Sequence, residues 1–169
     1  DEETKRISQT LLNLRAKKTK TGQLQTNRIA AFQLSQLFES ADNVQFSEEF
    51  RHLAHDLIHP EQFPLGELQV TAKLRDYQEV GVRWLSMLNH YGFGGILADD
   101  MGLGKTRQIL GAIEKFRRHT SHPVLVVVPT SVMSSWQDEA ESCFPEMALC
   151  LIQSTYARDP QGWNGLDRA

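Results

Sequence analysis

The spacing of apolar residues predicts an all-helical N-terminal part. Apolar residues recur on one side of a helix in two stretches: Ile7, Leu11, Leu12 and Leu14 within residues 1–18, and Ile29, Phe32, Leu34, Leu37 and Phe38 from about Asn27 onward. The polar, glycine-containing stretch KTKTGQLQT between them predicts a loop. A third helix is predicted from the N-cap Ser47 to about His59, since two glutamates follow the cap and a proline follows the histidine.

Two prolines and a loss of periodicity mark the next stretch, PEQFPLGELQV, as an irregular linker. The pattern changes after it. We therefore expect three segments: a helical N-terminal extension over residues 1–59, a linker over residues 60–72, and a unit of mixed helix and strand over residues 73–169.

Helical and strand patterns alternate beyond the linker. Residues 74–93 are helical, with Val80, Trp84, Leu85 and Leu88 spaced for one buried face. Short apolar runs typical of buried strands, GGILA, PVLVVVPT and ALCLIQ, alternate with helical patterns over residues 106–119 and 131–144. Such alternation predicts an α/β fold with a parallel sheet, flanking helices and right-handed crossovers.

A glycine-rich turn, DDMGLGKT, joins the first predicted strand to the next helix. The phosphate-loop pattern is G-x-x-x-x-G-K-[ST], and Asp99 stands where its first glycine is required. The setting nevertheless fits, because N–H groups at a helix N-terminus bind anions and Gly102 and Gly104 let the backbone approach closely. Lys105 would then reach the β- and γ-phosphates and Thr106 would ligate Mg²⁺. An ordinary glycine-rich connector is the alternative, which this setting disfavours.

The stretch GILADDMGLGKT resembles motif I of the Swi/Snf-type ATPases, helicase-like motors that translocate on double-stranded DNA. In that family an aspartate usually stands at the position of Asp99, and glutamate is common at that of Asp100. The stretch LRDYQEVGVRWL resembles the family segment whose glutamine, here Gln78, contacts adenine. Asp76 replaces the proline usual there, which leaves the turn entering this helix open.

A third stretch, LVVVPTSVMSSWQDEAESCFP, resembles motif Ia of the same family, with Val128 and Ser135 in place of the usual cysteine and asparagine. The three motifs follow in family order across residues 73–146. The stretch TGQLQTNRIAAFQLSQLF is more weakly similar to the region before the motor in bacterial members. The resemblance implies a partial RecA-like P-loop lobe preceded by an all-helical segment.

The resemblance also implies ATP and Mg²⁺ as cofactors and double-stranded DNA as a partner. ATP-binding residues would be Gln78, Asp99, Met101, Gly102, Leu103, Gly104, Lys105 and Thr106. Among them, Lys105 and Thr106 would serve catalysis, and Thr106 would ligate Mg²⁺. Thr130 and Ser131 follow a predicted strand end, and their hydroxyl and N–H groups would contact a nucleic-acid backbone, with a helix N-cap as the equally good alternative.

Phosphoryl transfer also needs an acidic pair at a strand end, and usually an arginine finger. In the family these lie in a D-E-A-H-like box and on a second, C-terminal RecA-like lobe, and neither appears before Ala169. The letters Asp-Glu-Ala occur within QDEAESCF, but inside a predicted helix, so we reject them as the acidic box. The chain thus resembles the front part of a motor, and alone it is expected to bind nucleotide weakly without appreciable ATPase activity.

Composition adds limits to this interpretation. The 169 residues are 40% hydrophobic with a net charge of −3, and no apolar run approaches the ~18 residues of a membrane span. We expect a cytoplasmic protein, nucleoid-associated if bacterial, with Cys143 and Cys150 as buried free thiols. His52, His55 and His59 share one helix face, a spacing more typical of a half-solvated surface than of a metal site.

The basic stretch RAKKTKTGQLQTNR supports an alternative function. In that case the chain is a non-catalytic nucleic-acid or protein interaction module that retains the P-loop as a scaffold. A small P-loop kinase or GTPase is disfavoured by Asp99 at the glycine position and by the helix that carries Gln78 upstream.

Overall fold

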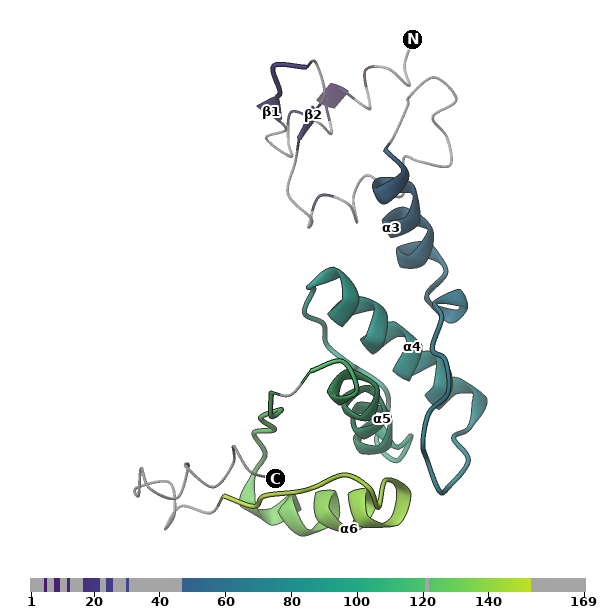
Figure 1. The fold of residues 1–169 in the computed structure, drawn as a ribbon, viewed down its shortest axis with the longest axis vertical. Helices are drawn as coiled ribbons and strands as arrows, with labels where there is room; N and C mark the ends of the chain where they lie inside the picture. Colours follow the sequence, from purple (N-terminus) through teal and green to yellow (C-terminus); the bar gives the residue numbers. More distant parts are fainter. Residues whose placement is uncertain are drawn as a thin grey trace. The chain divides into compact units, whose positions relative to one another are not determined.

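The computed structural model describes residues 47–120 and 122–152, and before them residues 5, 8, 9, 12, 17–21, 24, 25 and 30 (Figure 1). The chain divides into two units, Asp1–Gln62 and Phe63–Ala169, each held together by its own contacts. Within the described part of the chain, no helix combines the length and apolar character needed to cross a membrane.

The first unit contains a short antiparallel pair, β1 (Lys17–Lys18) with β2 (Leu24–Gln25), in which Lys17 lies opposite Gln25. The helix predicted over residues 1–18 is therefore wrong at its last two residues, although residues 5, 8, 9 and 12 are helical. Of the second predicted helix only Ala30 is described; it is helical and buried, and the remaining positions lie outside the described residues.

The third predicted helix is confirmed as α3 (Glu48–Ile58). The hydroxyl of Ser47 accepts a hydrogen bond from the Phe50 N–H at 3.3 Å, so the serine caps the helix as its sequence position indicates. The helix closes where the His59 N–H donates to the His55 carbonyl, and a 3₁₀ turn, η1 (Pro60–Gln62), follows.

The described part of the second unit contains three α-helices: α4 (Asp76–Tyr91), α5 (Lys105–Arg117) and α6 (Met133–Cys143), the last preceded by the 3₁₀ turn η2 (Thr130–Val132). They confirm the three helices predicted in this region. Figure 1 shows α5 between α4 and α6, and it packs against both. This central helix carries the glycine-rich loop at its N-terminus.

Two small apolar clusters among the described residues contribute to the core of this unit. One contains Leu110, Ala140, Cys143 and Phe144, with Trp136 packed against it, and the other contains Leu65, Leu74 and Val82. Leu68, from the predicted linker, packs against both clusters. The predicted buried face of α4 is partly wrong, because Val80 is 42% exposed and Gln78, Val82, Met87 and Leu88 are the buried residues.

The predicted parallel sheet, and with it the RecA-like α/β lobe, is wrong for the described residues. GGILA, PVLVVVPT and the described part of ALCLIQ contain no strand, and no described backbone hydrogen bond joins one of these segments to another. A strand exists through its ladder to a neighbour, and β-branched composition alone supplies no neighbour. Their side chains are correspondingly open to solvent: Ile96 is 87%, Leu125 71% and Val127 85% exposed.

The cysteines and histidines take no part in a disulfide or metal site among the described residues. Both cysteines are free, but only Cys143 is buried, so the prediction of a buried thiol is wrong for Cys150. At the end of α3 the ring centroids of His55 and His59 lie 5.2 Å apart with the rings tilted by 50°, and the described residues hold no cluster of metal-ligating side chains.

Candidate nucleotide-binding site

The glycine-rich loop runs directly into the N-terminus of α5. Gly104 is the N-cap, with φ of 73°, and Gly102 has φ of 89°, so both adopt the left-handed conformation that side chains disfavour. A Cβ on Gly104 would lie 2.5 Å from Gln78 Nε2, whereas one on Gly102 would meet nothing within 4 Å. Gly104 is therefore required by its backbone and by its neighbour, and Gly102 by its backbone alone.

Lys105, the first residue of α5, folds back onto the loop. Its Nζ donates to the Asp99 carbonyl at 2.7 Å and to the Asp100 carbonyl at 3.0 Å. An ammonium has three N–H donors, so one remains for a further acceptor. The positive charge therefore lies among the loop's own backbone, at the end of the helix where the macrodipole is also positive.

Gln78 ties the first turn of α4 to the loop. It is 4% exposed; its Oε1 accepts from the Arg75 N–H at 3.0 Å, and its Nε2 donates to the Leu103 carbonyl at 3.2 Å. A primary amide keeps a second N–H and a second lone pair, the two groups that an adenine edge requires. Asp76 is the first residue of α4, and proline is also favoured at the first position of a helix. The aspartate that stands here in place of the family's proline therefore leaves the start of the helix intact.

Gln108 is a site residue that the sequence analysis missed. It is 0% exposed, and its Nε2 donates to Asp99 Oδ2 at 2.8 Å and to the Leu103 carbonyl at 3.5 Å. The available signal is its spacing of four residues from Gly104, because helical side chains lean toward the N-terminus and this one then lies over the loop. Residues 106–119 were considered only as a helical pattern, so the position of Gln108 relative to the loop was overlooked.

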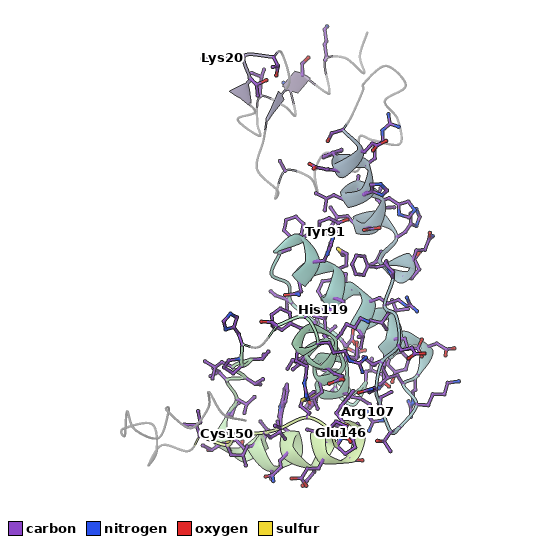
Figure 2. The ribbon with its side chains drawn as sticks, viewed as in Figure 1. Lys20, Tyr91, Arg107, His119, Glu146 and Cys150 are labelled. Atoms are coloured by element: carbon purple, nitrogen blue, oxygen red, sulfur yellow. The ribbon has the colours of Figure 1, made fainter. Side chains whose placement is uncertain are left out.

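Arg107 and Glu139 join α5 to α6, and both were also missed. Arg107 Nε donates to Glu139 Oε1 at 2.6 Å, and each side chain is about one-third exposed (Figure 2 labels Arg107). Burial alone would lower the pKa of Arg107, but the hydrogen bond to Glu139, together with the interactions with Cys143 and with the charge of Glu139, outweighs it and raises that pKa. Glu139 belongs to the rejected Asp-Glu-Ala letters, and it lies inside α6.

The remaining predicted site residues differ in their surroundings. Met101 is 97% and Leu103 36% exposed. Thr106 is half-buried in the first turn of α5, and its hydroxyl makes no hydrogen bond among the described residues. Thr130 and Ser131 are exposed in η2, and no side chain caps α6, whose N-cap residue is Val132. No described hydrogen bond or ion pair joins these two residues to the loop.

Two protein-family models match the chain. The model of the SNF2-related domain covers residues 77–164, and a model described as bacterial SNF2 helicase associated covers residues 1–65.

Several relatives are similar to part of this chain. The putative ATP-dependent helicase/translocase YwqA of Bacillus subtilis is 39% identical over 116 residues, which are 64% of this chain and 12% of YwqA. An uncharacterized ATP-dependent helicase of Mycoplasma pneumoniae is 43% identical over 78 residues, 45% of this chain and 8% of that protein. Helicase SWR1 of Debaryomyces hansenii is 41% identical over 100 residues, 54% of this chain and 6% of SWR1.

The chain thus spans 12% or less of the length of these three relatives. The SNF2-related model alone covers residues 77–164, more than half of the 169 residues. The chain therefore belongs to the SNF2-related family.

Proposed function

We propose that residues 99–106 bind the phosphates of ATP, as part of an ATP-dependent, SNF2-type translocase that acts on double-stranded DNA. The observation that carries the proposal is the loop itself. Two left-handed glycines bring its backbone to the N-terminus of α5, and the Lys105 ammonium lies against the carbonyls of Asp99 and Asp100. A helix N-terminus with a lysine and an open backbone is suited to a polyphosphate.

The proposal gives each site residue one task. Lys105 uses its remaining N–H donor, and its charge, on the β- and γ-phosphates. The Thr106 hydroxyl, which has no hydrogen bond among the described residues, is an oxygen ligand of the kind Mg²⁺ prefers, and the ion would neutralise phosphate charge. Gln78 uses the free half of its amide on the adenine edge. Met101 and Leu103, both exposed, flank the backbone that faces the nucleotide.

The DNA contact and the activity of the whole protein rest on family membership. The relatives are named as ATP-dependent helicases or translocases, and the chain spans a small part of each. We assign Thr130 and Ser131 to the DNA backbone, because their hydroxyls are exposed at a turn and cap no helix.

We further propose that the 169 residues alone bind nucleotide without appreciable turnover. DNA-stimulated ATP hydrolysis that Lys105→Ala abolishes would contradict this last point.

Nucleotide binding is tested by titrating Mg²⁺–ADP and Mg²⁺–ATP into the chain while recording backbone amide NMR spectra. We expect shifts centred on Gly102–Thr106 and on Gln78. Lys105→Ala should weaken binding by at least about tenfold, since a hydrogen bond to a charged group contributes roughly 1.5–3 kcal/mol.

Lys73→Ala is the matched control, because Lys73 is exposed and lies just before α4. It should leave the affinity for Mg²⁺–ADP unchanged. A well-dispersed spectrum that shows no shift with either nucleotide, or equal affinity in the Lys105 and Lys73 variants, would contradict the proposed site.

A further inference from the structure

An aspartate in a phosphate-binding loop poses an electrostatic problem. Asp99 lies six residues before Lys105, where a phosphate loop commonly has glycine, and its carboxylate carries the same sign of charge as the proposed ligand. A carboxylate free to turn toward the phosphates would oppose their binding. In the structure it is not free, because Asp99 Oδ2 accepts a hydrogen bond from Gln108 Nε2 at 2.8 Å.

Gln108 is held in one orientation by its surroundings. Its side chain is fully buried, and a Cβ on Gly81 of α4 would lie 1.8 Å from its Oε1, so the amide fills space that this glycine leaves open. Its Oε1 is buried without a hydrogen-bond partner. Turning the amide over would set that oxygen against the Asp99 carboxylate, so the NH₂ group must face the loop.

The unpaired oxygen argues against a role in packing alone. A buried acceptor without a donor destabilises the folded state, and an apolar side chain of the same length would fill the space without that penalty. The glutamine gains in return its bonds to Asp99 and to the Leu103 carbonyl, both within the loop.

The backbone of Asp99 extends the connection to Lys105. The Asp99 carbonyl accepts from Lys105 Nζ at 2.7 Å, while its carboxylate is held by Gln108. We propose that Gln108 is a positioning residue of the nucleotide site: it holds the Asp99 carboxylate against the second turn of α5, away from the phosphates, and thereby sets the carbonyl that orients Lys105. This inference rests on the proposed ATP-binding function of the loop.

Gln108→Met tests the proposal with the fold preserved, because methionine matches glutamine in length and lacks both the donor and the unpaired oxygen. We expect an unfolding midpoint in urea that is unchanged or higher. In the ligand-free chain the amide signals of Asp99–Lys105 should shift, and the Kd for Mg²⁺–ADP should rise about tenfold, because an Asp99 carboxylate released from residue 108 repels the phosphates. A purely structural role predicts instead that stability falls, or that affinity does not change, and either result would overturn the proposal.

A reversed pair gives the sharper test. At a pH where both carboxyl groups are ionised, Gln108→Glu places a second carboxylate against that of Asp99, and should shift the loop signals and weaken Mg²⁺–ADP binding. Adding Asp99→Asn exchanges donor and acceptor, so the new amide at position 99 can donate to the new carboxylate at position 108. We expect the double variant to restore the loop signals and most of the affinity. A double variant no better than Gln108→Glu would overturn the proposal.

Gln137→Glu is the matched control. Gln137 Nε2 also donates to a carboxylate, Glu141 Oε1 at 2.7 Å, but on the exposed side of α6. This variant should leave the signals of residues 99–105 unmoved. The two proposals fail separately: a wild-type chain that does not bind Mg²⁺–ADP contradicts the proposed function, whereas the ligand-free signals and their rescue decide the role of Gln108 by themselves.

Discussion

At the scale of single residues, two buried glutamines from different helices converge on one carbonyl. Gln78 of α4 and Gln108 of α5 donate to the Leu103 oxygen at 3.2 and 3.5 Å. The loop is therefore held from two sides by neutral amides, which add no charge near the proposed phosphates. Such an arrangement favours a loop already shaped for its ligand, which lowers the ordering cost of binding.

The sequence identified one of these glutamines and missed the other, for a physical reason. The loop and Lys105 follow from local spacing, because glycines just before a helix start allow the positive φ angles that such a turn uses. Gln78 was found through the family resemblance alone. The contact between Gln108 and Asp99 depends on how the loop curls back over α5, which spacing along the chain does not specify.

The two left-handed glycines of the loop offer a residue-scale prediction. Gly102→Ala should lower the free energy of unfolding by about 1–2 kcal/mol, because alanine disfavours positive φ. No atom would crowd the new Cβ, so no steric cost is added. Gly104→Ala carries the same penalty and also displaces Gln78 Nε2 from Leu103, so we expect about 1 kcal/mol more.

Urea unfolding followed by tryptophan fluorescence measures both changes, since Trp84 and Trp136 belong to the second unit and residues 1–62 contain no tryptophan. Gly94→Ala is the control, because a Cβ there would meet nothing within 4 Å and its φ lies outside the left-handed range. Equal losses for the Gly102 and Gly104 variants would contradict the close approach of Gln78 to the loop.

At the scale of elements, the helices were predictable and the strands were not. Periodicity and end signals placed α3, α4, α5 and α6, since a helix makes its hydrogen bonds within its own segment and Ser47 caps α3 locally. The apolar runs at residues 94–98 and 123–130 have strand composition but no hydrogen-bonded partner among the described residues. Strand pairing is a contact between two segments, and the composition of one segment does not specify the segment with which it pairs.

The bond between Arg107 and Glu139 gives a prediction at the element scale, because it joins α5 to α6. A double-mutant cycle with Arg107→Met and Glu139→Gln should give a coupling free energy of about 0.5–1 kcal/mol, as expected for a partly exposed pair. The coupling should shrink in 1 M salt, where the screening length falls to about 3 Å.

Glu141 on α6 supplies the comparison for that cycle. Its carboxylate accepts from Gln137 within the same helix, so Arg107→Met with Glu141→Gln should show no coupling. Urea midpoints of the four variants in each cycle measure both numbers. A coupling in the first cycle that is zero at low salt would mean that the bond between Arg107 and Glu139 does not hold α5 to α6.

At the scale of the whole molecule, two independent divisions of the chain nearly coincide. The structure separates Asp1–Gln62 from Phe63–Ala169, and the two family matches cover residues 1–65 and 77–164. The SNF2-related match and the candidate site therefore both belong to the second unit. The first unit matches a model described as bacterial SNF2 helicase associated, and no site residue is assigned to it.

The second unit exposes an uncharged apolar run, and this predicts self-association. Leu125 is 71% and Val127 85% exposed, and residues two apart in an extended chain face the same side. Residues 124–128, VLVVV, contain neither charge nor proline, and short β-branched segments of this kind pair readily with copies of themselves. Leu125→Lys with Val127→Lys should suppress concentration-dependent association, measured by light scattering, while the free energy of unfolding changes by no more than about 0.5 kcal/mol per site.

Val80→Lys, at a 42% exposed position inside α4, should leave association unchanged, because a helical residue has no free backbone groups to pair. Equal suppression by Val80→Lys would show that net charge, and not the apolar run, controls association.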